Sequence, residues 1–254
     1  MHKPAILNGL LVDLEFGKPD NSRFEELRTN LCEKLTLRVA HDPVITIRLE
    51  HLHFSQFDQI RNNMKTRDFI LLSPQGTPWR SYRGVLRQQL DIFGKLLVET
   101  VRSADIPVLG ICGGHQFLAM SFGADIDFID SQFVGSSPET YPVHARAERG
   151  LTVLNTLRDD SIFGGVAKHP STFEVMESHT EEVKNTPYPF VNLARSAISE
   201  IQLITIPGTI VYGMAFHPER GWSENISGES DATAGEKLLR NFFNLVYLNR
   251  YKAL

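Results

Sequence analysis

The residue with the clearest chemical potential is Cys112, in the segment Gly110-Ile111-Cys112-Gly113-Gly114. A buried strand is predicted before this segment and a helix after it. A strand-to-helix turn of this kind exposes its central side chain as a nucleophile and needs neighbours without bulk, which glycines provide. The free N–H groups at a helix N-terminus also favour an anion. The spacing therefore predicts a reactive thiolate, and the alternative is a buried structural cysteine in a glycine-rich turn.

A thiol nucleophile needs a base and a group that orients the base. His217 and Glu219 offer both in AFHPE at 215–219, directly after the apolar run 210–214. At an extended strand end, residues i and i+2 point the same way, so Glu219 can fix the tautomer of His217. A His-x-Glu pair alone is weak support for a site. Combined with the turn at Cys112, it predicts a Cys112–His217–Glu219 triad.

The first half of the chain alternates short apolar runs with amphipathic stretches, which is typical of parallel βαβ units. The expected strands are 6–14, 44–49, 68–72 and 105–110. The expected helices are 54–64, 81–103 and 114–122, preceded by one capped at Asn21 or Ser22 with apolar positions Phe24, Leu27, Leu31 and Leu35. Cys32 falls inside this first helix and is expected in the core. The loop 73–78, SPQGTP, follows a strand, and loops at strand ends commonly carry function.

The second half contains short β-like runs that extend or flank the sheet. They are 143–146, 151–154, 172–176, 191–196, 201–206 and 210–216. An amphipathic helix over 233–247, capped by Ser230 or Asp231, closes the chain. We therefore expect an α/β fold over a single domain, residues 1–254. Its central sheet is mostly parallel with helices on both faces, flavodoxin-like, with extra short strands in the second half.

Composition excludes several classes of protein. Hydrophobic residues are 42% of the chain and charged residues 22%, as in ordinary folded proteins. Lys and Arg number 26 against 30 Asp and Glu, without a long basic run, which argues against nucleic acid and membrane partners. No stretch approaches the roughly 18 apolar residues of a membrane span, and Asn8, Asp13 and Glu15 interrupt the N-terminal apolar run. With only two cysteines, the chain is expected to be cytoplasmic.

The motifs carry a family resemblance. GICGGHQ at 110–116 with FHPE at 216–219 resembles the class I glutamine amidotransferases, whose cysteine and His-x-Glu pair form a glutaminase triad. PVLGICGGHQFLAMSFGADI resembles the strand, turn and helix of the same family, and MESHTEEV at 176–183 resembles MSHGDEV of its GMP synthetase branch. PFVNLARSAISEIQLI is similar to GFxxLAxSxxxxIxA, and VYGMAFHPE to YGVQFHPE. The resemblance covers about residues 66–246 and is nearest to the GMP synthetase-like branch.

The resemblance implies roles for the triad. Cys112 would attack the side-chain amide carbon of glutamine, form a γ-glutamyl thioester and release ammonia. His217 would protonate the leaving amine and then activate water, while Glu219 orients His217. No cofactor and no metal is implied.

The oxyanion of such an intermediate requires two N–H donors. One is expected from the backbone of Gly113. The other is expected from the loop 73–78, where this chain has SPQGTP and the family often has SGGP or SPGPG. Because Pro74 has no N–H, Gln75 is the first candidate and Gly76 the second.

The amino-acid end of glutamine would be held by Gln116 and the backbone at His179 and Thr180. The sequence departs from the family here, with Thr180 for Gly and Glu181 for Asp. Gly113 also replaces a larger residue, which is expected to loosen the pocket wall without removing the donor. The stretch 220–233 is expected to be a surface loop beside the mouth of the site.

Other side chains are expected to be structural. His51 and His53 alternate near a strand end without a second pair nearby, so we expect them to be exposed rather than to bind a metal. His115 should turn away from Cys112. Trp79 and Tyr82 either cover the pocket or pack the loop that precedes them.

Three functions follow. The leading one is a glutaminase that supplies ammonia to a synthetase on another chain, because no Walker-type glycine loop is present and the length leaves no room for a synthetase domain. The second is a stand-alone γ-glutamyl hydrolase acting on a γ-glutamyl amide. The third is a catalytically silent relative that only binds a partner, against which the intact triad argues.

Overall fold

The computed structural model describes residues 5–16, 45–103, 106–136, 142–220 and 233–251. The expected first helix, with Asn21, Ser22 and Cys32, lies outside these ranges, as do Ser230, Asp231 and most of the loop after Arg220. None of the helices in the described part of the chain combines the length and apolarity needed to span a membrane.

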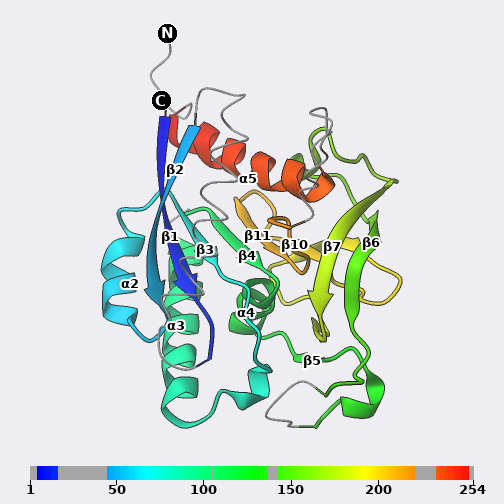
Figure 1. The fold of residues 1–254 in the computed structure, drawn as a ribbon. Helices are drawn as coiled ribbons and strands as arrows, with labels where there is room; N and C mark the ends of the chain where they lie inside the picture. Colours follow the sequence, from blue (N-terminus) through cyan, green and yellow to red (C-terminus); the bar gives the residue numbers. More distant parts are fainter. Residues whose placement is uncertain (1–4, 17–44, 104–105, 137–141, 221–232, 252–254) are drawn as a thin grey trace, which may run out of the picture.

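Within the described residues, nine strands form the main sheet, in the order β2-β1-β3-β4-β11-β10-β9-β6-β7 (Figure 1). Their bounds are β1 Ala5–Asp13, β2 Ile45–His53, β3 Phe69–Leu72, β4 Val108–Ile111, β6 Glu148–Thr156, β7 Thr172–His179, β9 Val191–Arg195, β10 Leu203–Thr205 and β11 Val211–Met214. Strands β2, β1, β3, β4 and β11 pair in parallel, and the remaining pairings are antiparallel. The parallel block has the 2-1-3-4-5 order of flavodoxin-like folds, which confirms the expected α/β class.

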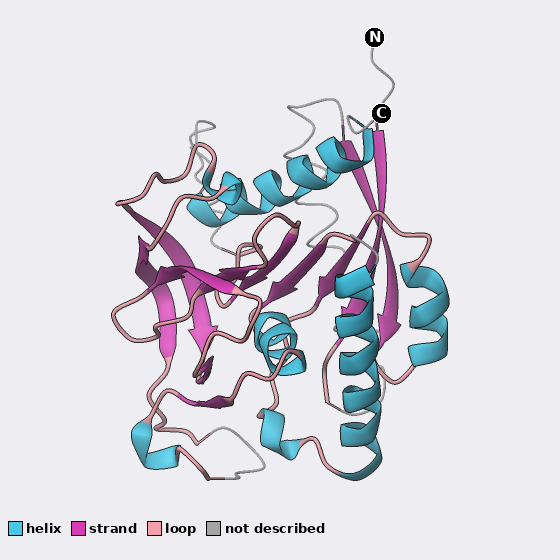
Figure 2. Cartoon of the chain, turned by 180° about the vertical axis from the view of Figure 1, so that it is seen from behind, coloured by secondary structure: helices cyan, strands magenta, loops and turns pink. Residues whose placement is uncertain are grey.

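Helices cover both faces of this sheet (Figure 2). They are α2 Phe57–Met64, α3 Gly84–Ser103, α4 Gly113–Ser121 and α5 Ala234–Tyr251, with short 3-10 helices η1 Trp79–Ser81, η2 Ser131–Phe133 and η3 Ser161–Phe163. Because successive side chains of a strand point to opposite faces, Leu11 belongs to the same hydrophobic cluster as Phe242 of α5, whereas Leu10 belongs to the cluster that contains Phe93 of α3. Burial on both faces explains why the central strands β3, β4 and β11 have no charged residue and are buried throughout.

Most expected elements are present within a few residues. The strand expected at 143–146 is wrong: the Ala145 N–H donates to the Pro142 carbonyl in a turn, and Val143 is exposed. The alternating pattern there is too short to hold a strand without a partner. Sequence patterns also do not predict β5 (Ile126–Phe128) and β8 (Glu181–Val183), which form a separate two-stranded sheet. At the start of α5, the hydroxyl of Thr233 accepts a hydrogen bond from the backbone N–H of Glu236, as a helix-capping side chain does.

The expectation that His51 and His53 are exposed is also wrong. His53 is 1% exposed, and its ring lies 2.7 Å from the Ser55 hydroxyl and 3.1 Å from the Glu15 carbonyl. His51 Nε2 lies 3.8 Å from Asp13 Oδ2. The residues that follow β1 cover the end of β2, so its polar side chains find partners inside the fold.

Candidate active site

Cys112 connects β4 to α4 in a strained conformation, with φ 49° and ψ −106°. Among the described residues it is the one non-glycine residue with a positive φ, and such strain gathers at functional turns. A Cβ added at Gly110 would lie 2.4 Å from the Gly114 carbonyl oxygen, and one added at Gly114 would lie 2.2 Å from that of Leu72. Neither overlap is possible, so both positions require glycine, as the sequence pattern indicates.

The structure brings His217 and Glu219 to this cysteine. β11 pairs in parallel with β4, with Met214 opposite Ile111, so the chain after β11 passes beside the turn. The His217 N–H donates to the Met176 carbonyl at 2.8 Å, and its Nδ1 lies 2.6 Å from Glu219 Oε1. The Cys112 side chain also interacts with this imidazole, and its Sγ lies 4.0 Å from the Ser178 carbonyl oxygen. All three side chains are buried.

Electrostatics favour a protonated imidazole at His217. Burial lowers the pKa of His217, but the negative charge of a Cys112 thiolate, its hydrogen bond and Glu219 outweigh that effect and raise the pKa to about 10. Because Cys112 and Glu219 both favour the charged form of His217, the arrangement fits a thiolate–imidazolium pair. Such a pair can attack an electrophilic carbon and then give a proton to the leaving group.

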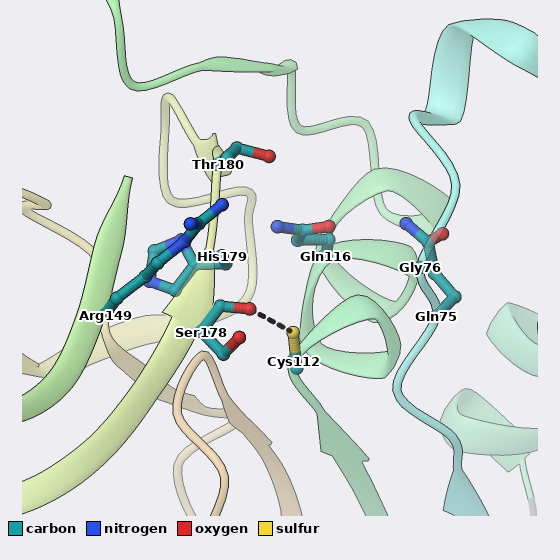
Figure 3. Close-up of a pocket in the computed structure, with 8 residues that line it drawn as sticks. All are labelled: Gln75, Gly76, Cys112, Gln116, Arg149, Ser178, His179 and Thr180. Atoms are coloured by element: carbon teal, nitrogen blue, oxygen red, sulfur yellow. Dashed lines mark hydrogen bonds between the residues drawn. The ribbon is translucent and has the colours of Figure 1, made fainter. Parts of the chain in front are cut away.

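A cavity of about 180 Å³ opens above Cys112 (Figure 3). It is lined by Gln75, Gly76, Cys112, Gln116, Arg149, Ser178, His179 and Thr180. Sequence reasoning identifies all of these except Arg149 and Ser178. Both come from the pairing of β6 with β7, where Arg149 lies opposite Ser178, and pairing between strands of this kind leaves no local sequence signal.

The loop 73–78 contains the two backbone amides predicted as candidate oxyanion donors, those of Gln75 and Gly76, and their surroundings differ. The Gly76 N–H donates to Glu15 at 3.0 Å, and the Thr77 hydroxyl donates to the same carboxylate at 3.2 Å. The Gly76 N–H therefore has an acceptor already. Gln75 N would lie only 2.8 Å from a Cβ built on Gly113, which places the two backbone amides side by side. Of the two amides, that of Gln75 is thus the one that lies beside Gly113.

The expectation that Gly113 loosens the pocket wall is wrong. A Cβ on Gly113 would lie 2.3 Å from Gln75 Cγ. The side chain of Gln75 therefore fills the space that a larger residue at position 113 would take. Its Oε1 accepts from the Thr77 N–H at 2.6 Å, which fixes the side chain there. The two departures from the family pattern compensate for each other.

Gln116 is held at both ends of its amide. Its Oε1 accepts from Trp79 Nε1 at 2.7 Å, and its Nε2 donates to the Glu181 carbonyl at 2.6 Å. Trp79 is buried and stacks on Phe117, and the Tyr82 hydroxyl donates to the Leu14 carbonyl. Of the two interpretations of these aromatic residues, the structure supports packing of the loop, which in turn orients Gln116.

Behind the pocket, His179 belongs to a buried charge cluster. Its Nε2 lies 3.1 Å from Glu177 and 3.5 Å from Glu148, while its Nδ1 lies 2.9 Å from the Glu181 carbonyl. Burial lowers the pKa of His179, but the hydrogen bond and charge of Glu177 outweigh it and raise the pKa to about 9. An imidazolium between two carboxylates accounts for the arrangement.

The same three side chains, Glu148, Glu177 and His179, could hold a metal ion, since their ligand atoms lie within 4.8 Å of one another. The Gln202 side-chain amide already donates to Glu148 at 2.7 Å. No sequence motif indicates this cluster, because Glu148 and Gln202 come from segments far apart in the sequence.

His115 takes no part in the pocket. It is fully buried, and this burial lowers its pKa to about 3. A Cβ on Gly213 would lie 2.7 Å from its Nδ1. The side chain therefore faces β11 and is structural, as expected.

Fold and site together define a class of protein: an α/β protein that presents a buried cysteine on a strained strand-to-helix turn to a histidine–carboxylate pair. The model of the family Glutamine amidotransferase class-I matches residues 49–243. The chain belongs to that family, and the resemblance seen in its motifs is confirmed.

Relatives from other organisms agree with this assignment. The chain is 34% identical over 152 residues to a protein of Methanosarcina mazei that is named as one of the subunits of glutamine-hydrolysing GMP synthase. It is also 34% identical to the protein of the same name from Pyrococcus abyssi, over 149 residues. Each match covers 59% of this chain and spans only 65% of the relative's length.

Two crystal structures share the fold at low sequence identity. A protein from Thermoplasma acidophilum, described as one of the subunits of GMP synthase, superposes with a TM-score of 0.64 and 21% identity, covering 97% of this chain and 98% of that one. A glutamine amidotransferase from Thermotoga maritima superposes with a TM-score of 0.55 and 16% identity. This match covers 96% of this chain and 85% of that one.

Proposed function

We propose that this protein hydrolyses the side-chain amide of glutamine to glutamate and ammonia, with Cys112 as nucleophile, and passes the ammonia to a synthetase on a separate chain. The observation that carries the proposal is the position of His217 beside the pocket, where its ring lies 2.6 Å from Glu219 and interacts with Cys112. Membership of a glutamine-hydrolysing family supports it.

In the first half of the reaction, the Cys112 thiolate attacks the amide carbon and forms a carbon–sulfur bond. The negative charge that develops on the amide oxygen would be received by the N–H groups of Gly113 and Gln75. His217 then gives its proton to the amide nitrogen. The carbon–nitrogen bond breaks, ammonia leaves, and a γ-glutamyl thioester remains on Cys112.

In the second half, neutral His217 takes a proton from a water molecule, whose oxygen attacks the thioester carbon. The carbon–sulfur bond breaks, glutamate leaves, and the thiolate–imidazolium pair is restored. Glu219 remains anionic throughout and holds the Nδ1 side of the ring, so that Nε2 faces Cys112.

The pocket favours glutamine over bulkier γ-glutamyl amides. At about 180 Å³ it is smaller than the roughly 300 Å³ at which drug-sized ligand pockets begin. Gln116, oriented by Trp79, and the backbone at His179 and Thr180 would hold the amino-acid end. The relatives named as subunits of GMP synthase suggest that the ammonia acceptor is a second protein chain of the same enzyme.

The test is ammonia release from a panel of γ-glutamyl amides that includes glutamine. We expect equal amounts of ammonia and glutamate from glutamine, slowly from the protein alone and faster with its synthetase. Rapid turnover of bulky γ-glutamyl amines without a partner would support the stand-alone hydrolase instead. Failure of a glutamine-analogue alkylating agent to modify Cys112 would support the catalytically silent relative.

Replacing Glu219 by glutamine should shift the pH dependence of the reaction. The pKa of His217 is raised in part by Glu219, so Glu219→Gln lowers it and the imidazolium is lost at a lower pH. The alkaline limb of kcat/KM should move to lower pH, with a loss of about ten- to a hundredfold at the optimum, because the thiolate still supports the imidazolium. Glu174→Gln, an exposed carboxylate on β7, is the matched control. An alkaline limb at the same pH in both variants would contradict the role of Glu219.

A further inference from the structure

The pocket contains a cation that the reaction scheme does not use. Arg149 lines the cavity together with Cys112 and Thr180, yet its side chain is exposed. Within the part of the chain that the structure describes, no carboxylate is paired with its guanidinium. His179 also lines the cavity, but its side chain is held between Glu148 and Glu177. Arg149 is therefore the charge that remains available to a ligand.

Strand pairing directs Arg149 into the pocket. On β6 and β7, Arg149 lies directly opposite Ser178, and Glu148 lies opposite His179. Opposed residues of an antiparallel pair share a face, and adjacent residues alternate between faces. Glu148 and the His179 side chain are consequently buried in the charge cluster, whereas Arg149 and Ser178 face the cavity.

The position of Arg149 within the cavity suits the end of the substrate that does not react. Figure 3 shows its side chain extending from β6 past His179 toward Thr180. Gln75 and Gly76 lie on the opposite side, and Cys112 lies between the two sides. A glutamine whose side-chain amide lies over Cys112 must place its charged amino-acid end elsewhere in the same small cavity.

We infer that Arg149 binds the α-carboxylate of the substrate and thereby selects amino acids with a free α-carboxylate. This inference rests on the proposed function and deepens it. A guanidinium matches a carboxylate with two parallel hydrogen bonds. The chain would then accept free glutamine and discriminate against glutamine whose α-carboxyl is esterified or part of a peptide bond. Arg149 is a binding residue rather than a catalytic one.

The test compares two alkylating probes, 6-diazo-5-oxo-L-norleucine, which has a free α-carboxylate, and its α-methyl ester. The rate of modification of Cys112 is followed by intact mass. We expect the wild-type protein to react about ten- to a hundredfold faster with the free acid, because hydrogen bonds to a charged group contribute this much. Arg149→Ala should lose that preference, Arg149→Lys should keep part of it, and both should react with the ester like the wild type.

Two controls separate the possible outcomes. Arg146→Ala removes an exposed charge outside the cavity lining and should keep the full preference. Iodoacetamide, which has no amino-acid end, should modify Cys112 at the same rate in all variants, which shows that the turn is intact. Equal rates for acid and ester in the wild type, or an undiminished preference in Arg149→Ala, would overturn the inference alone. If iodoacetamide modifies Cys112 but neither probe does, the proposed function fails and the inference fails with it.

Discussion

Replacing Cys112 by alanine is expected to abolish glutamine hydrolysis. The thiolate forms the bond that breaks the amide, and no other described side chain in the cavity lining is a comparable nucleophile held against His217. Removal of a nucleophile of this kind lowers kcat by a factor on the order of 10⁶, which is below detection in an ammonia assay. Because Cys112 is buried and small, the substitution should change the melting temperature little.

The second cysteine of the sequence provides the control. Cys32→Ala removes the other thiol and should leave ammonia release at the wild-type rate. Activity in Cys112→Ala above the background of the assay, after a contaminating glutaminase has been excluded by a mock purification, would contradict the assignment of the nucleophile.

Gly113→Ala is expected to reduce activity by about 10²- to 10³-fold, which is the usual effect of losing one oxyanion donor. The added Cβ would lie 2.3 Å from Gln75 Cγ and 2.8 Å from Gln75 N. It must therefore displace the loop 73–78 and the backbone amide that we assign to the oxyanion. KM should change less than kcat, because the charge on the oxygen develops in the transition state.

The overlap with Gln75 makes this prediction specific. Gln75→Gly removes Cγ but not the backbone nitrogen, so the double variant Gly113→Ala with Gln75→Gly should recover part of the lost kcat. A double-mutant cycle measures this coupling directly. A fully active Gly113→Ala, or a double variant no better than the sum of its single changes, would show that the two positions do not compensate for each other.

The features predicted correctly from the sequence are local ones. The strand 68–72 is buried over all four residues of β3, and a continuous apolar run identifies such a strand wherever its partners lie. The glycines around Cys112 are required by contacts within the turn and with the neighbouring β3. His217 and Glu219 are two residues apart at a strand end, and their contact follows from that spacing.

The features that the sequence did not predict depend on contacts between distant segments. The Glu15 carboxylate accepts a hydrogen bond from the N–H of Gly76, which lies 61 residues further along the chain. This contact occupies the Gly76 amide and leaves the Gln75 amide as the candidate donor. Arg149 faces the pocket only because β6 pairs with β7, and its immediate neighbour Glu148 is buried for the same reason. The strand wrongly predicted at 143–146 is the opposite case. Its local sequence pattern is suitable for a strand, but no neighbouring strand is there to pair with it.

The most direct test of the account is to identify the atom that a glutamine analogue modifies. The protein would be inactivated with 6-diazo-5-oxo-L-norleucine, digested, and mapped by mass spectrometry while residual glutaminase activity is followed. We predict one adduct per chain, on the peptide that contains Cys112, with activity lost in proportion to its formation and protection by glutamine. An adduct on another residue, or full glutaminase activity in protein completely modified at Cys112, would contradict the account.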